Sequence, residues 1–233
     1  MKQFVKNIYL DKSNLKKAVV IGATGLIGSH LVKQLLADNR FAEVVVFVRR
    51  ATGIKDTKLK EYVIDFKKPD EWSGKVKGDV FFSVLGTTLK QAGSKESEYK
   101  VDYTYQYLFA QAADENKIPA YILVSSAGAN EKSRIFYTRM KGELDRDVQK
   151  LNFSSIHIIR PGLLAGKREK KRKAEKVYYI ILNFLVKFGI FTGYRPVLAK
   201  NVAKLMIYYS FMDGRGIHES DEMHKVLLSL KII

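Results

Sequence analysis

The sequence predicts an α/β protein in which helices flank a doubly wound parallel sheet. Three observations support this fold: apolar β-branched runs alternate with helical patterns, the first run ends in a glycine-rich turn, and 233 residues suit one domain. Six apolar runs are expected to form buried strands. They are Lys17–Ala23, Glu43–Val48, Glu61–Phe66, Asp79–Leu85, Pro119–Ser126 and Ser155–Arg160.

Helical spacing occupies most connections between these strands. The predicted helices cover Leu26–Asp38, Glu96–Asn116 and Arg134–Lys150. After Gly162 the pattern changes, and we expect a single domain (1–233) with a core over about 17–162 and a small C-terminal lobe over about 163–233. The lobe is predicted to contain a basic loop, an apolar helix over 177–188, a helix near Ala199–Phe211 and a short strand at Gly216–Ser220.

The most apolar stretch is Val177–Phe191, which includes Asn183 and Lys187. It is shorter than the about 20 residues that a membrane span needs, so we expect a buried helix and no transmembrane segment. The first 17 residues contain no apolar run long enough for a signal-peptide core. From these two observations we expect a cytoplasmic protein.

The charge is strongly basic: 41 Lys and Arg against 24 Asp and Glu give a formal net charge of +17. Such an excess favours contact with a nucleotide phosphate, a nucleic acid or an anionic membrane surface. The chain has no cysteine, which excludes disulfides, thiolate zinc sites and cysteine nucleophiles. The four histidines (His30, His157, His218 and His224) lack metal-ligand spacing, so we expect no metal site.

A G-x-x-G-x-x-G turn follows the first predicted strand and opens a helix. In such a turn the first glycine allows tight bending, the second allows a pyrophosphate to approach the backbone, and the third lets the helix pack on the sheet. A chance glycine cluster is the alternative, but the position between strand and helix favours a nucleotide. The expected cofactor contacts here are Gly22, Thr24, Gly25, Leu26, Ile27 and Gly28.

The second predicted strand ends in Arg49 and Arg50. A site that prefers NAD usually places Asp or Glu there, to hold the ribose 2′-hydroxyl. Two guanidiniums instead suit a 2′-phosphate, so the sequence favours NADP(H) over NAD(H). The alternative is a solvated arginine pair at a strand end.

Tyr137 and Lys141 lie four residues apart on a predicted helix and therefore project from one face. This helix follows the fifth strand, which ends in Ser125 and Ser126 at the edge where such folds bind ligands. A lysine ammonium favours the phenolate form of a nearby tyrosine. Tyr137 could then exchange a proton with a substrate oxygen while Ser126 holds that oxygen and Lys141 also binds the nicotinamide ribose. The sequence does not decide whether Ser125 or Ser126 is the catalytic hydroxyl.

The order of these motifs resembles that of the short-chain dehydrogenases/reductases, in an atypical form similar to the HIV Tat-interacting-protein-like oxidoreductases. The resemblance covers about residues 17–230. It implies NADP(H) bound on a Rossmann fold, with Asp65 and Phe66 near adenine, Leu85, Gly86 and Thr87 against the cofactor, and Pro161 and Leu163 near the nicotinamide. The segments that carry it, besides the glycine-rich turn, are Leu85-Gly86-Thr87-Thr88, Val101-Asp102-Tyr103, Ser125-Ser126-Ala127-Gly128-Ala129, Tyr137 through Lys141-Gly142-Glu143 and Arg160-Pro161-Gly162-Leu163-Leu164.

Two features depart from the larger family pattern. The fourth strand ends in Leu-Gly-Thr-Thr rather than Asn-Ala-Gly, and the asparagine of the usual catalytic tetrad has no clear counterpart, although Asp102 lies near its expected position. The leading hypothesis is an NADP(H)-dependent oxidoreductase that transfers hydride to or from a carbonyl or hydroxyl substrate. The alternative is an NADP(H)-binding regulatory or scaffold protein with little turnover.

The segment 167–176 concentrates seven basic and two acidic residues beside the predicted substrate edge. It could contact an anionic substrate, an acyl-phosphate or CoA-like group, a membrane surface or nucleic acid, but a solvated loop is favoured. No aromatic residues are interleaved for base stacking, which argues against nucleic acid. We therefore expect a small-molecule substrate that can be anionic. A homodimer is compatible with the sequence, which does not determine the oligomeric state.

Overall fold

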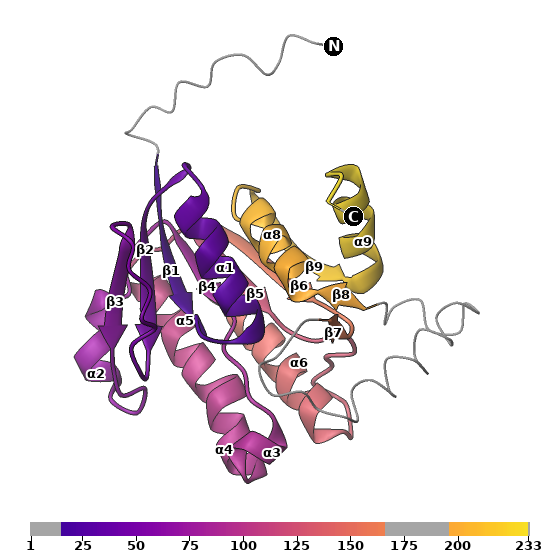
Figure 1. The fold of residues 1–233 in the computed structure, drawn as a ribbon. Coiled ribbons are helices and arrows are strands. Elements are labelled where there is room, and N and C mark those ends of the chain that lie inside the picture. The colour runs from indigo at the N-terminus through magenta and orange to yellow at the C-terminus, as the bar shows by residue number, and fades with distance from the viewer. Residues whose placement is uncertain (1–14, 166–195, 233) are drawn as a thin grey trace.

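The computed structural model describes residues 15–165 and 196–232, and its centre is a seven-stranded parallel sheet (Figure 1). From the inner strand β1 the chain adds β2 and β3 on one side, then crosses to β4 and continues outward on the other side. The strand order is β3-β2-β1-β4-β5-β6-β9, so the predicted doubly wound fold is confirmed. The strands are β1 (Lys16–Ile21), β2 (Phe41–Val48), β3 (Leu59–Val63), β4 (Val80–Ser83), β5 (Ala120–Val124), β6 (Ser155–Arg160) and β9 (Gly214–Glu219).

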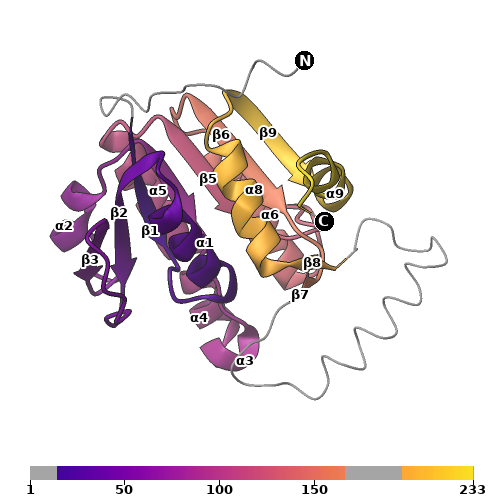
Figure 2. The same cartoon turned by 45° about the horizontal axis from the view of Figure 1, so that its top comes forward.

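Helices cover both faces of the sheet (Figure 2). Because side chains alternate along a strand, Val20 packs into the core under α1, α8 and α9, whereas Val19 and Ile21 pack into the core under α5 and α6. The two apolar layers fix the strand ends in space. The helices are α1 (Leu26–Ala37), α2 (Pro69–Trp72), α3 (Leu89–Ala92), α4 (Lys95–Tyr99), α5 (Tyr105–Glu115), α6 (Phe136–Val148), α8 (Ala199–Tyr209) and α9 (Ser220–Ser229).

Two predicted elements differ in the structure. The third strand starts and ends earlier than predicted, because Phe66 leaves the sheet and packs against Tyr105 and Phe109. The predicted helix over 96–116 is interrupted by a π-helical turn at Lys100–Thr104, which separates α4 from α5. Before this turn, α4 has only one aromatic or apolar residue, Tyr99, so the periodicity could not reveal the interruption.

The C-terminal part completes the sheet. The predicted short strand at 216–220 is the end of β9, which pairs in parallel with β6 at the edge of the main sheet. A separate pair of short strands, β7 (Leu164–Ala165) and β8 (Val197–Leu198), lies beside it. The predicted basic loop at 167–176 and the apolar helix over 177–188 fall outside the described residues. Within residues 15–165 and 196–232, no helix has both the length and the apolarity to cross a membrane.

Candidate functional site

The glycine-rich turn is fixed by close backbone packing at its two ends. Gly22 has a φ of +81°, and a β-carbon there would lie 2.5 Å from the Val84 carbonyl group. A β-carbon on Gly28 would collide with the Gly22 carbonyl oxygen. Only glycine therefore brings the start of α1 this close to the ends of β1 and β4.

The start of α1 is open toward the carboxyl edge of the sheet. Gly25 is the N-cap, no side chain caps the helix, and the first turn contains no acidic residue. Thr24 and Gly25 are exposed. The backbone N–H groups and the positive end of the helix dipole are thus free to bind an anion.

A cavity of about 490 Å³ lies at the same edge. It brings Arg49, which follows β2, together with Leu85, Gly86 and Thr87, which follow β4. Two further cations, Lys67 after β3 and Lys100 in the π-helical turn, also line it. The cavity therefore has the charge that suits a phosphate-bearing ligand.

Three other predicted cofactor contacts, Arg50, Asp65 and Phe66, do not line this cavity. Arg50 is exposed and is absent from the residues that line this cavity. Asp65 is exposed and its carboxylate accepts the backbone N–H of Lys67 at 3.0 Å, so it shapes the turn after β3. The Phe66 side chain is buried in the core, which leaves only its backbone for a cofactor. The sequence analysis did not select Lys67 or Lys100. Lys67 could have been selected by the criterion that selected Arg49, because it comes shortly after the end of β3 as Arg49 comes after the end of β2.

The helix α6 presents Tyr137 and Lys141 on one face, as predicted. Tyr137 lies in the first turn with 37% of its surface exposed, whereas Lys141 is 4% exposed. The Lys141 Nζ atom is 6.0 Å from the centre of the Tyr137 ring. A β-carbon on Gly142 would collide with the backbone of Asn130 and Glu131, so the loop after β5 packs tightly against this helix.

The two serines at the end of β5 differ in environment. Ser125 is buried, and its hydroxyl faces the Asp145 carboxylate without a hydrogen bond of good geometry. Ser126 is half-buried, and its hydroxyl makes a long contact of 3.4 Å with the Ala127 carbonyl. Ser126 is therefore the serine with a hydroxyl that a ligand can reach.

Lys141 forms a buried ion pair with Asp102. The distance from Nζ to the Asp102 Oδ1 atom is 2.9 Å, and the two side chains are 4% and 2% exposed. Burial is the largest influence on the Lys141 ammonium and lowers its pKa, but Asp102, Tyr137 and Asp145 together outweigh burial, so the pKa is raised. Lys141 is thus a fixed cation between the phenol of Tyr137 and the cavity wall.

The segment after β6 closes the other side of the site. The Pro161 carbonyl accepts the backbone N–H of Ala127 at 3.0 Å, which ties this segment to the serine loop. The Leu163 carbonyl accepts the N–H of Val197 at 2.9 Å, immediately before β8 pairs with β7. Pro161 and Leu163 therefore both lie beyond the carboxyl end of β6, and Pro161 is bonded to the loop that contains Ser126.

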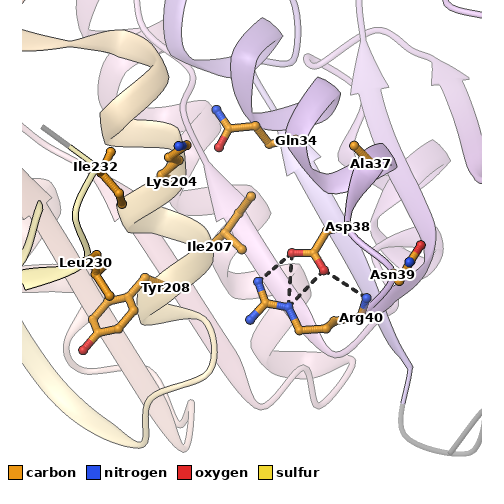
Figure 3. A pocket seen from close by; sticks show the side chains of 10 residues that line it. All are labelled: Gln34, Ala37, Asp38, Asn39, Arg40, Lys204, Ile207, Tyr208, Leu230 and Ile232. Carbon is orange, nitrogen blue, oxygen red and sulfur yellow. Dashed lines mark hydrogen bonds and ion pairs between the residues drawn. The ribbon is translucent and has the colours of Figure 1, made fainter. Parts of the chain in front are cut away.

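A larger cavity is lined by none of these residues, and Figure 3 shows the side chains that do line it. It has a volume of about 720 Å³ and is lined by the C-terminal end of α1, by α8 and by Leu230 and Ile232. On its wall Asp38 and Arg40 pair at 2.6 Å. Because it occupies the opposite end of α1 from the glycine-rich turn, it is not the candidate site. Among the described residues, no three His, Asp or Glu side chains are grouped to hold a metal ion.

Comparison with known proteins identifies the family. Residues 22–178 match the family model described as NAD(P)H-binding. The chain belongs to this NAD(P)H-binding family. Its motifs and fold make it an atypical short-chain dehydrogenase/reductase, as the resemblance implied.

Relatives and solved structures agree with this assignment. "Protein FMP52, mitochondrial" from Debaryomyces hansenii is 38% identical over 195 residues, which cover 82% of this chain and 86% of the relative. The protein of the same name from Eremothecium gossypii is 33% identical over 220 residues, which cover 92% of this chain and 97% of the relative. These names overturn the expectation of a cytoplasmic protein, which depended on apolar-run lengths alone.

Among solved structures, the Bordetella bronchiseptica enzyme WbmH in complex with NAD+ superposes on this NAD(P)H-binding protein with a TM-score of 0.67 and 15% identity. The match covers 94% of this chain and 82% of that one. The UDP-glucose 4-epimerase of Thermotoga maritima gives a TM-score of 0.65 with 12% identity, and the match covers 92% of this chain and 82% of that one. At these identities the likeness establishes the fold.

Proposed function

We propose that the protein binds NADP(H) and transfers hydride between NADPH and a carbonyl or hydroxyl group of a small-molecule substrate. The observation that carries the proposal is the geometry of α6, where the exposed phenol of Tyr137 lies one helical turn from the buried ammonium of Lys141. Both follow the carboxyl end of β5, the edge at which doubly wound sheets bind their ligands.

The residues at this edge fit a phosphorylated dinucleotide. The uncapped start of α1 suits a pyrophosphate, because its N–H groups and helix dipole favour anions. Arg49, Lys67 and Lys100 converge on one cavity and suit the extra charge of a 2′-phosphate. Bound NADPH would supply the hydride.

The protein's own side chains would then transfer the proton. Tyr137 donates its hydroxyl proton to a carbonyl oxygen in the reductive direction and accepts a proton in the reverse direction. Lys141, charged through its pair with Asp102, stabilises the negative charge left on the phenol oxygen. The Ser126 hydroxyl donates a hydrogen bond that holds the substrate oxygen.

A titration tests the choice of cofactor. The dissociation constants of NADPH and NADH are measured by cofactor fluorescence for the wild type, Arg49→Ala and Arg50→Ala. We expect Arg49→Ala to weaken NADPH about 10- to 100-fold, because a charge-assisted contact to phosphate is lost, and to leave NADH nearly unchanged. Arg50→Ala is the matched control and should have a smaller effect, because Arg50 does not line the cavity. Equal affinity of the wild type for NADH and NADPH would refute the NADP preference.

The second candidate function is an NADP(H)-binding regulatory protein with little turnover. The observation that favours it is the lack of a clear counterpart to the tetrad asparagine, near whose expected position the chain has Asp102. A chain that binds NADPH tightly and oxidises it with no member of a broad panel of aldehydes and ketones would support this alternative.

We also propose a mitochondrial location, since the FMP52 relatives are named mitochondrial. Fractionation of cells that express the tagged chain tests it, and recovery in the cytosol would refute it.

A further inference from the structure

Asp102 connects two parts of the site through one carboxylate. Its Oδ1 atom lies 2.9 Å from the Lys141 Nζ atom, and its Oδ2 atom accepts the backbone N–H of Thr87 at 2.7 Å. Thr87 belongs to the wall of the cavity that contains Arg49. The carboxylate therefore fixes the position of Lys141, which lies beside Tyr137, relative to Thr87 in the cavity wall.

The backbone of Asp102 is also held by buried contacts. Asp102 lies in the π-helical turn, and its carbonyl accepts the Nε2–H of Gln106 at 2.7 Å. The Gln106 Oε1 atom in turn accepts the Ser83 hydroxyl at 2.6 Å, and both side chains are fully buried. The carbonyl oxygen at position 102 is thus occupied by a protein donor, and the turn is anchored to the end of β4.

The groups that surround the pair are mostly acidic. Glu98 from α4 is 5% exposed, and burial raises the pKa of its carboxyl. Asp145 from α6 is 1% exposed and pairs with Arg160 of β6 at 2.9 Å. Lys141 therefore has one direct counter-ion, Asp102, with two further buried carboxyls at greater range, so its positive charge is well compensated.

We propose that Asp102 is a positioning residue that keeps Lys141 permanently charged and fixed between Tyr137 and the cofactor wall at Thr87. This inference rests on the proposed function and deepens it. Lys141 then acts as a constant electrostatic partner, because a lysine that never loses its proton cannot relay one. The proton that Tyr137 gives to a substrate oxygen is then replaced from solvent, to which 37% of the Tyr137 surface is exposed.

The test follows the charge of Lys141 through the pH dependence of NADPH binding. Asp102→Asn keeps the size of the side chain and an oxygen that can accept the Thr87 N–H, but it removes the counter-ion. Burial then lowers the pKa of Lys141, so its ammonium should lose its proton within the range studied. The NADPH dissociation constant is measured by cofactor fluorescence between pH 6.5 and 9.5 for the wild type, D102N and D102N/K141R.

We expect the ratio of the D102N to the wild-type dissociation constant to rise about tenfold across this range. The reason is that Lys141, once neutral, loses its charge-assisted contact with the nicotinamide ribose. D102N/K141R should show no such rise, because the guanidinium of arginine stays charged. A purely structural role of Asp102 would weaken binding equally at every pH. A constant ratio for D102N, or the same rise in D102N/K141R, would overturn the proposal.

A double-mutant cycle tests the ion pair without cofactor. Thermal unfolding is measured for D102N, K141M and D102N/K141M. The pair requires the double variant to lose less stability than the sum of the two single losses, since each single change leaves one buried charge without its partner. This also holds if D102N alone fails to fold while D102N/K141M folds. Additive losses would contradict the pair. If the wild type binds no NADPH, the proposed function fails, whereas the cycle still decides the pair.

Discussion

At the scale of single residues, the described core contains a pair of histidines that lie far apart in the sequence. His157 of β6 and His218 of β9 approach to 2.9 Å between Nδ1 and Nε2. His157 Nε2 is 3.2 Å from the Met212 carbonyl, which can only accept, so this nitrogen carries the proton. His218 Nδ1 lies 2.9 Å from Glu222, and the Tyr209 ring stacks on both imidazoles.

This arrangement predicts a loss of stability in mild acid. Burial lowers the pKa of His157, so the unfolded chain binds its proton more readily than the folded chain does. The free energy of unfolding should therefore be highest above about pH 6.5 and fall as the pH drops below it. Urea unfolding of the wild type and His157→Gln between pH 5 and 8 tests this prediction. The variant should show a shallower pH dependence, and parallel curves for the two proteins would contradict it.

Sequence spacing located the candidate catalytic side chains but not their partners. Tyr137 and Lys141 could be placed on one face from their spacing alone, because helical geometry is local. The partner of Lys141 could not be identified in this way, because the pair with Asp102 depends on how α6 packs against the π-helical turn. The choice between Ser125 and Ser126 likewise depends on burial, which the identical side chains do not reveal.

At the scale of elements, the buried strands were predictable and their edges were not. β6 matches its predicted range because the apolar run and the strand coincide at Ser155–Arg160. β3 ends before its predicted limit because the apolar side chain of Phe66 packs in the core under α5 and not in the strand. β9 was expected only as a short strand, since its pairing with β6 is a long-range contact.

The contact between α1 and β1 gives a prediction at this scale. Gly28→Ala would place a β-carbon against the Gly22 carbonyl oxygen, so α1 must move away from the turn. We expect a loss of about 1–3 kcal/mol in the free energy of unfolding and weaker NADPH binding. Gly74→Ala is the control, because nothing lies within 4 Å of a β-carbon there. Chemical unfolding and NADPH titration of both variants check this, and equal stability of the two would contradict the packing account.

At the scale of the whole molecule, the doubly wound topology gathers the site from distant segments. The ends of β1, β2, β4, β5 and β6 contribute the glycine-rich turn, Arg49, Leu85–Thr87, Ser126 and Pro161 to one edge of the sheet. The net charge of +17 has part of its explanation there, in the three cations of one cavity. Composition alone could not separate a nucleotide from other polyanions, whereas the arrangement of these cations beside an uncapped helix favours the nucleotide.

In the proposed reaction, Tyr137 exchanges a proton with the substrate during hydride transfer. The most direct measurement is the oxidation of NADPH, followed by absorbance, by the wild type and Tyr137→Phe over one panel of aldehydes and ketones, with NADPH affinity measured in parallel. We expect turnover by the wild type on at least one carbonyl. We expect a loss of about 10²- to 10⁴-fold in Tyr137→Phe, with NADPH affinity changed less than about threefold. Turnover by Tyr137→Phe equal to that of the wild type, or no turnover by the wild type on any carbonyl, would contradict this role of Tyr137.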